Sequence, residues 1–163
     1  MKYSIIILVI ASLFLGFTPQ KSKSIKWVSF DELRELQKTK PRKVFIDVYT
    51  DWCGWCKHMD KTTFSDPEVA DYVNEKYYAV KLNAEGVNKI LYQGKVVTEA
   101  ELAGKVWGIT GYPTTVYLGE DMNPLTQPVS GFLNKDMFIK VVKFFGEGAY
   151  KTQTWEQYQK SPN

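Results

Sequence analysis

The sequence predicts an α/β domain in which a central mixed sheet is covered by helices on both faces. Helical and strand patterns alternate along the chain, which is the order expected of a sheet flanked by helices. Residues 44–49 form an apolar run typical of a central strand that is buried on both faces. Two late strand patterns follow each other directly and predict an antiparallel pair. The 163 residues provide for one such domain.

The first twenty residues have a different character from the rest of the chain. Lys2 is followed by an uncharged run, residues 5–17, that consists mainly of Ile, Leu, Val and Phe. This pattern is typical of a secretory signal, and a membrane-spanning helix needs about 20 apolar residues. Because no clear cleavage site follows the run, an uncleaved anchor is the alternative. We therefore expect residues 1–20 to be a signal peptide or N-terminal anchor and residues 21–163 to be the folded domain of an exported protein.

The first folded elements can be read from their start signals. Ser29 and Glu32 have the spacing of a capping box and predict a helix from about residue 29 to 38. Residues 44–49 are rich in β-branched and aromatic side chains and predict a strand. Asp47 in its middle is the one charged residue of that strand.

The alternation continues through the second half of the chain. Asp66 and Pro67 are a cap followed by proline at the first helical position. Thr98 and Glu101 have capping-box spacing. The remaining expected elements are a strand over 77–83, a helix from 98 to about 107, a strand over 114–118, a core helix capped by Asn134 and a short helix in the tail 147–163.

The two cysteines carry the clearest chemical signal. Cys53 and Cys56 lie only two residues apart, and a bridge that closes so small a ring removes little entropy from the unfolded chain. A structural zinc site needs four ligands, and the chain adds only His58 as a further nitrogen or sulfur ligand of that kind. Covalent haem attachment requires histidine directly after the second cysteine, where Lys57 stands. Redox chemistry is the favoured reading, with a structural disulfide or a zinc site as the alternatives.

The predicted position of the pair gives each cysteine a separate role. The pair follows a strand and opens a helix, and a helix N-terminus lowers a thiol pKa from about 8.5 toward roughly 3.5–7.5. We expect Cys53 to be the exposed nucleophile and Cys56 to lie one turn inward, within reach of a mixed disulfide at Cys53. This chemistry needs neither a metal nor a cofactor.

Composition excludes other classes of function. The chain is 44% hydrophobic and 24% charged, which is typical of a globular protein. The net charge is +3, and no stripe of basic residues interleaved with aromatics is present, so we expect no nucleic-acid partner.

Three segments together carry a resemblance to a known family. Residues 44–57, with Asp47 ahead of the cysteines and Trp52 directly before them, resemble the active-site region of thioredoxin. Residues 80–83 resemble the thioredoxin strand that faces this aspartate, and residues 111–114 resemble the segment with the family's cis-proline. The matches span roughly residues 28–145. The chain is also similar to exported thioredoxin-like proteins, including the C-terminal domains of transmembrane thiol–disulfide interchange proteins.

The resemblance implies a thioredoxin-like fold and a periplasmic or membrane-tethered location facing the periplasm. It implies that Asp47 assists deprotonation of Cys56. Burial in an apolar strand independently favours a raised pKa for this carboxyl group. Lys81 is a candidate partner for Asp47, and the alternative is a lysine on the solvated face of its strand.

The remaining candidate residues surround the cysteines. By the resemblance, Pro113 is cis and lies against the pair, with its neighbours offering backbone groups to a substrate peptide. Trp52, Trp55 and Tyr112 are then substrate contacts, and ordinary aromatic packing is the alternative.

Two departures from the family pattern concern function. Trp55 replaces the proline usual in reducing thioredoxins, and this position tunes thiol pKa and reduction potential. The segment between Asn83 and Pro113 is longer than in a minimal thioredoxin, and its residues 91–97 predict a small hairpin.

We expect a monomeric protein-disulfide reductase that acts on exported disulfide-containing proteins and is recharged by a membrane or soluble redox partner. A disulfide oxidant or isomerase with the same cysteines is the first alternative. A redox-inactive binding module with this fold is the second.

Overall fold

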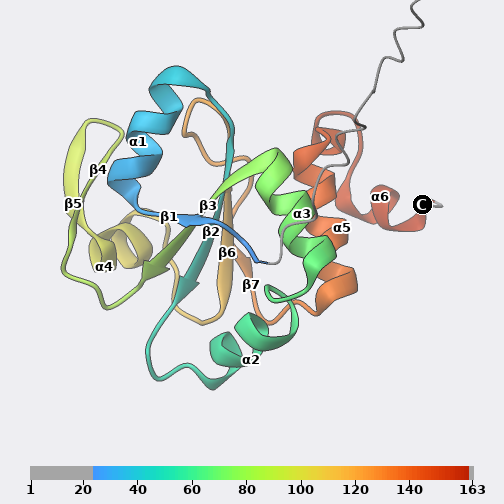
Figure 1. The fold of residues 1–163 in the computed structure, drawn as a ribbon, viewed down its shortest axis with the longest axis horizontal. Coiled ribbons are helices and arrows are strands. Elements are labelled where there is room, and N and C mark those ends of the chain that lie inside the picture. Colours follow the sequence, from blue (N-terminus) through green and yellow to red (C-terminus); the bar gives the residue numbers. More distant parts are fainter. Residues whose placement is uncertain (1–23, 162–163) are drawn as a thin grey trace, which may run out of the picture.

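The structure is a computed structural model that describes residues 24–161. Five strands form the central sheet in the order β1-β3-β2-β6-β7 (Figure 1). The first three strands of this order are parallel, whereas β6 is antiparallel to β2 and β7 is antiparallel to β6. The mixed sheet and the late antiparallel pair are therefore confirmed. The strand bounds are β1 Trp27–Val28, β2 Lys43–Tyr49, β3 Tyr77–Asn83, β6 Thr114–Leu118 and β7 Val129–Ser130.

The helices begin where the caps predict. Ser29 accepts a hydrogen bond from the Glu32 N–H, and Asp66 caps a helix with Pro67 at its first position. Asn134 caps the core helix α5 in the same way. The α-helices are α1 Phe30–Thr39, α2 Gly54–Thr62, α3 Pro67–Lys76, α4 Glu99–Glu101, α5 Lys135–Gly146 and α6 Trp155–Lys160, the predicted short helix of the tail.

Helices pack against both faces of the sheet through two separate apolar clusters. One apolar cluster joins Phe45 and Tyr117 of the sheet to α2, α3 and α5. The other joins Ile46 and Val116 to α1 and to the segment that contains α4. Figure 1 shows these two layers on either side of the strands. The predicted architecture of helices on both faces is confirmed.

The segment between β3 and β6 contains the predicted hairpin, with strands β4 Lys89–Tyr92 and β5 Lys95–Thr98. Gln93 and Gly94 form its turn, and both have the positive φ that two-residue hairpin turns require. The helix predicted from 98 to 107 is instead a single turn of α4 followed by a π-helical turn, Leu102–Val106. The capping box of Thr98 and Glu101 forms in full, so the start is as predicted and only the later pitch differs.

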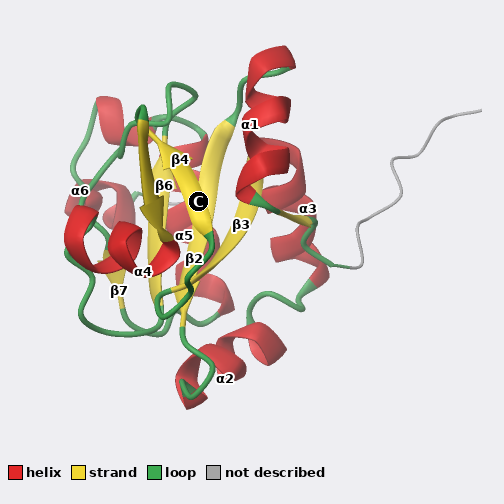
Figure 2. Cartoon of the chain, turned by 90° about the vertical axis from the view of Figure 1, so that its left-hand side faces the viewer, coloured by secondary structure: helices red, strands yellow, loops and turns green. Residues whose placement is uncertain are grey.

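The ends of β2 and β3 lie at the side of the molecule occupied by α2, as Figure 2 shows. This places the cysteines at one end of the sheet, whereas the tail helix α6 packs against α5. The predicted signal peptide or anchor, residues 1–20, lies outside the described residues. Within residues 24–161, no helix has the length and apolar character needed to cross a bilayer.

Candidate active site

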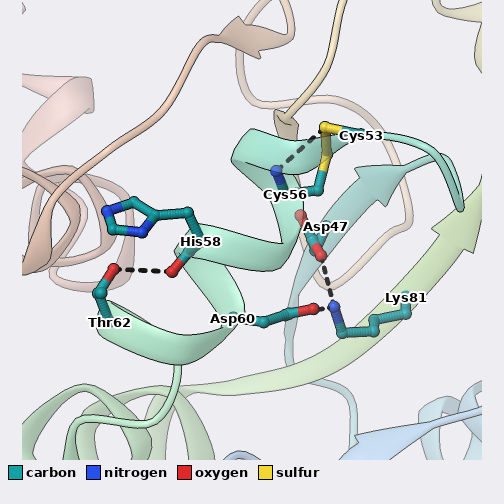
Figure 3. A network of polar contacts seen from close by, with 7 residues as sticks. All are labelled: Asp47, Cys53, Cys56, His58, Asp60, Thr62 and Lys81. Carbon is teal, nitrogen blue, oxygen red and sulfur yellow. Dashed lines mark hydrogen bonds and ion pairs between the residues drawn. A yellow bond between two sulfur atoms is a disulfide. The ribbon is translucent and has the colours of Figure 1, made fainter.

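The cysteine pair lies at the junction of strand β2 and helix α2. Cys53 is the N-cap of α2, and its Sγ accepts a hydrogen bond of 3.0 Å from the Cys56 N–H. The two cysteines form a disulfide (Figure 3). A helix start places unpaired N–H groups beside the first sulfur, so the geometry favours a thiolate at Cys53 when the pair is reduced.

Both sulfur-bearing side chains are buried. Cys53 and Cys56 are each 4% exposed, so the expectation that Cys53 stays exposed is wrong for the disulfide form. In this form the Cys53 sulfur is bonded to Cys56 within the first turn of α2. Trp52 and Trp55 instead form the exposed surface here, at 67% and 61%. In the disulfide form, the accessible surface beside the pair is therefore aromatic.

A charge network lies near Cys56, in which Asp47 is buried while Lys81 and Asp60 are partly exposed. Lys81 Nζ is 2.8 Å from Asp47 Oδ2 and 2.5 Å from Asp60 Oδ1, so the predicted pairing of Lys81 with Asp47 is present and has a second carboxylate (Figure 3). β2 and β3 place Asp47 directly opposite Lys81. The other carboxylate oxygen of Asp47, Oδ1, is buried without a hydrogen-bond partner and points toward Cys56 in Figure 3.

Asp60 was not singled out from the sequence, although a signal for it exists. It lies four residues after Cys56 on the same helix, and residues at this spacing share a helix face. A carboxylate on the face that turns toward the sheet therefore accompanies the predicted resolving cysteine.

The network sets the proton affinity of its members. Burial raises the pKa of Asp47 to about 6, and Lys81 opposes this shift only in part. Burial acts to lower the pKa of Lys81, but the two carboxylates outweigh it and hold that pKa above its usual value. Asp47 is thus a proton acceptor suited to neutral pH, and Lys81 is a permanent cation beside it.

One aromatic flank of the disulfide contains Trp52 and Tyr112. Their rings meet edge to face at 6.0 Å, and the Trp52 indole N–H donates to Glu85 at 3.0 Å. The Tyr112–Pro113 peptide is cis, as the resemblance implies. Trp52, which directly precedes Cys53, thus contacts Tyr112, the residue before the cis-proline, whereas its contact with Glu85 was not predicted.

The other flank is a cluster of three rings. Trp55, His58 and Phe132 have pairwise centroid distances of 5.2–5.6 Å. Phe132 was missed because it comes from the loop before α5, far from the cysteines in sequence. His58 points away from the sulfur atoms in Figure 3. Across residues 24–161, no group of three or more His, Cys, Asp or Glu side chains has an arrangement that could hold a metal ion.

Comparison with known proteins agrees with this site. The family profile described as a thioredoxin-like domain matches residues 30–146. The chain is 28% identical over 131 residues to the thiol:disulfide interchange protein DsbD of Haemophilus influenzae, covering 76% of the chain and 21% of that protein. It is 30% identical over 125 residues to the DsbD of Actinobacillus pleuropneumoniae, covering 74% and 20%. The chain thus spans about a fifth of the length of these curated relatives.

Solved structures give the same result for the fold. The C-terminal domain of Neisseria meningitidis DsbD in the reduced form is similar with a TM-score of 0.51 and 25% identity, covering 72% of this chain and 97% of that one. A thioredoxin-fold protein from Helicobacter pylori has a TM-score of 0.62 at 18% identity, covering 72% and 76%. With its disulfide-bonded cysteine pair, the chain belongs to the thioredoxin-like family of thiol–disulfide oxidoreductases.

Proposed function

We propose that the protein reduces disulfides of exported proteins by dithiol–disulfide exchange through Cys53 and Cys56. The observation that carries this proposal is the free oxygen of the buried Asp47 carboxyl group, which faces Cys56. A buried resolving thiol must lose its proton before it can attack, and a carboxylate whose pKa burial raises to about 6 can accept that proton near neutral pH.

The reaction proceeds in two exchanges. The Cys53 thiolate attacks one sulfur of the substrate disulfide, so that a Cys53–substrate disulfide forms and the first substrate thiolate leaves. Cys56 then gives its proton to Asp47 and attacks Cys53. The Cys53–Cys56 disulfide forms, the second substrate thiolate leaves, and the pair has supplied two electrons.

The surroundings of Cys53 support the reducing direction. A strong oxidant owes its potential to a strongly stabilised reduced form. Here the one hydrogen bond that Cys53 Sγ accepts within residues 24–161 comes from the Cys56 N–H. His58 packs against Trp55 and Phe132, and the nearby Asp47 carboxylate disfavours a second negative charge.

The partners and location belong to the same proposal. Residues 5–17 support export, and a pair that ends each cycle oxidised needs a membrane or soluble partner that returns two electrons. We propose that Trp52, Trp55, Tyr112 and the backbone beside Pro113 contact the substrate chain, because both indoles are exposed next to the cysteines and Trp52 packs against Tyr112, which precedes the cis-proline. A monomer suffices for this reaction.

The reduction potential of the pair tests the direction. Equilibration with glutathione buffers, followed by quantification of free thiols, is expected to give a value near about −270 mV, as for thioredoxin. A value near about −120 mV would identify an oxidant instead, and one near about −180 mV an isomerase. Trp55→Pro is the matched variant, because it introduces the residue usual in reducing thioredoxins. Its reduction potential should also lie near about −270 mV.

A further inference from the structure

The ammonium group of Lys81 lies over three aromatic rings as well as between two carboxylates. Its Nζ is 5.0 Å from the ring centroid of Trp27, 5.1 Å from that of Tyr49 and 5.7 Å from that of Phe64. All three distances are within the range of about 6 Å over which a cation is attracted to a ring face. We refer to Trp27, Tyr49 and Phe64 as the aromatic cage.

The cage is assembled from three separate parts of the fold. Strand β1 pairs with β3 so that Trp27 lies opposite Ala79, two residues before Lys81. Because alternate residues of a strand share a face, Trp27 and Lys81 lie on the same face of the sheet, and Tyr49 of β2 shares that face with Asp47. Phe64 follows α2 and packs edge-on against Trp27 at 5.6 Å.

We propose that the three cage residues are positioning residues that hold the Lys81 ammonium against Asp47 while the carboxyl group gains and loses its proton. The proposal rests on the proposed function, in which Asp47 accepts the proton of Cys56. When Asp47 is protonated, Asp60 is the one charged partner that Lys81 keeps within residues 24–161. Asp60 is 43% exposed, and the flexible lysine side chain would follow it toward solvent without the cage.

The cage acts through position because none of its rings is charged in the range where Asp47 titrates. Burial first, and then the nearby Asp51, raise the pKa of Tyr49 above its usual value. Substitution of a cage ring by leucine therefore removes no charge. The titratable groups in direct contact with Lys81 are Asp47 and Tyr49 of β2 and Asp60 of α2. Lys81 also lines a polar cavity, whose other titratable groups are Asp31 of α1, Lys89 of β4 and Glu99 of α4.

The test follows the carboxyl carbon of Asp47 by NMR during a pH titration of the oxidised protein. In Trp27→Leu the ammonium group is free to move away, so the Asp47 carboxylate loses stabilisation and its titration midpoint should rise by about 0.5–1 pH unit. Trp27→Phe keeps a ring face and should restore most of the native midpoint. Tyr49→Leu changes a half-buried position, and it provides the same readout if Trp27→Leu does not fold.

Phe144→Leu is the control, because Phe144 belongs to the same apolar cluster but packs against Phe145, Tyr150, Trp155 and Tyr158. It should lower stability without moving the Asp47 midpoint. An unchanged midpoint in both leucine variants of the cage would overturn the proposal, and so would an equal shift in Phe144→Leu. The titration requires no substrate, so its failure is separate from a failure of the reductase function, which the reduction potential tests.

Discussion

Replacement of Cys53 by serine will lower kcat/KM for reduction of a protein disulfide by at least about three orders of magnitude. The sulfur of Cys53 caps α2 and is the atom that attacks the substrate, whereas a serine hydroxyl is not ionised at neutral pH. Turbidity from insulin reduced in the presence of dithiothreitol measures the loss. Native turnover by Cys53→Ser would show that the pair is not the reactive centre and would favour a redox-inactive binding module.

Cys56→Ser is the matched variant, because it keeps the attacking sulfur and removes the resolving one. It should react once and accumulate a mixed disulfide between Cys53 and the substrate, visible by mass spectrometry after non-reducing separation. Absence of any adduct would contradict the assigned order of the two cysteines.

The second large effect is expected from Asp47→Asn, which removes the proton acceptor while keeping the shape of the side chain. Resolution of the mixed disulfide should slow roughly tenfold to a hundredfold at pH 7. This is below the upper range for general base catalysis, because a few per cent of an ordinary thiol is already ionised at this pH. Stopped-flow tryptophan fluorescence in single turnovers measures the step. Asp60→Asn is the control, since it removes a charge from the same network and keeps Asp47.

The same variant will be more stable than the native protein at neutral pH. Because burial raises the pKa of Asp47 from 3.8 to about 6, the folded state holds a proton that the unfolded state has released between these values. The contribution of Asp47 to stability is therefore fully present below about pH 4 and is lost as the pH rises through about 6. Asp47→Asn should raise the free energy of unfolding by about 1–3 kcal/mol at pH 7. In urea titrations, this advantage should grow between pH 4 and 6.5; a constant or shrinking advantage would contradict the raised pKa.

Local signals made much of the fold predictable. The caps at Asp66 and Thr98 depend on side chains that bond to backbone groups two or three residues away, and both act as predicted. The apolar run of β2 indicated a central strand because few other positions in a fold bury both faces. By contrast, β1 is only two residues long and is defined by its pairing with β3. No local sequence pattern predicts that pairing.

The sequence predicted those residues of the candidate site that lie close together in one motif. Cys53, Cys56 and Asp47 come from a single strand and the start of the helix that follows it. Lys81 joins them because the pairing of β2 with β3 places it opposite Asp47. Phe132 and Trp27 come from distant segments and reach the site only through tertiary packing. Cys53 is buried although it is the N-cap of α2, so its position at the helix end alone predicted the wrong exposure.

The reductase function is tested most directly by the direction in which two electrons move between this protein and a disulfide-containing protein. Fully reduced protein is mixed with an equal amount of oxidised insulin in the absence of any other thiol. After an acid quench, mass spectrometry determines from the mass of each protein whether its disulfides are formed or reduced. We expect the Cys53–Cys56 disulfide to form as insulin becomes reduced. Insulin that stays oxidised beside a fully reduced Cys53–Cys56 pair would contradict it.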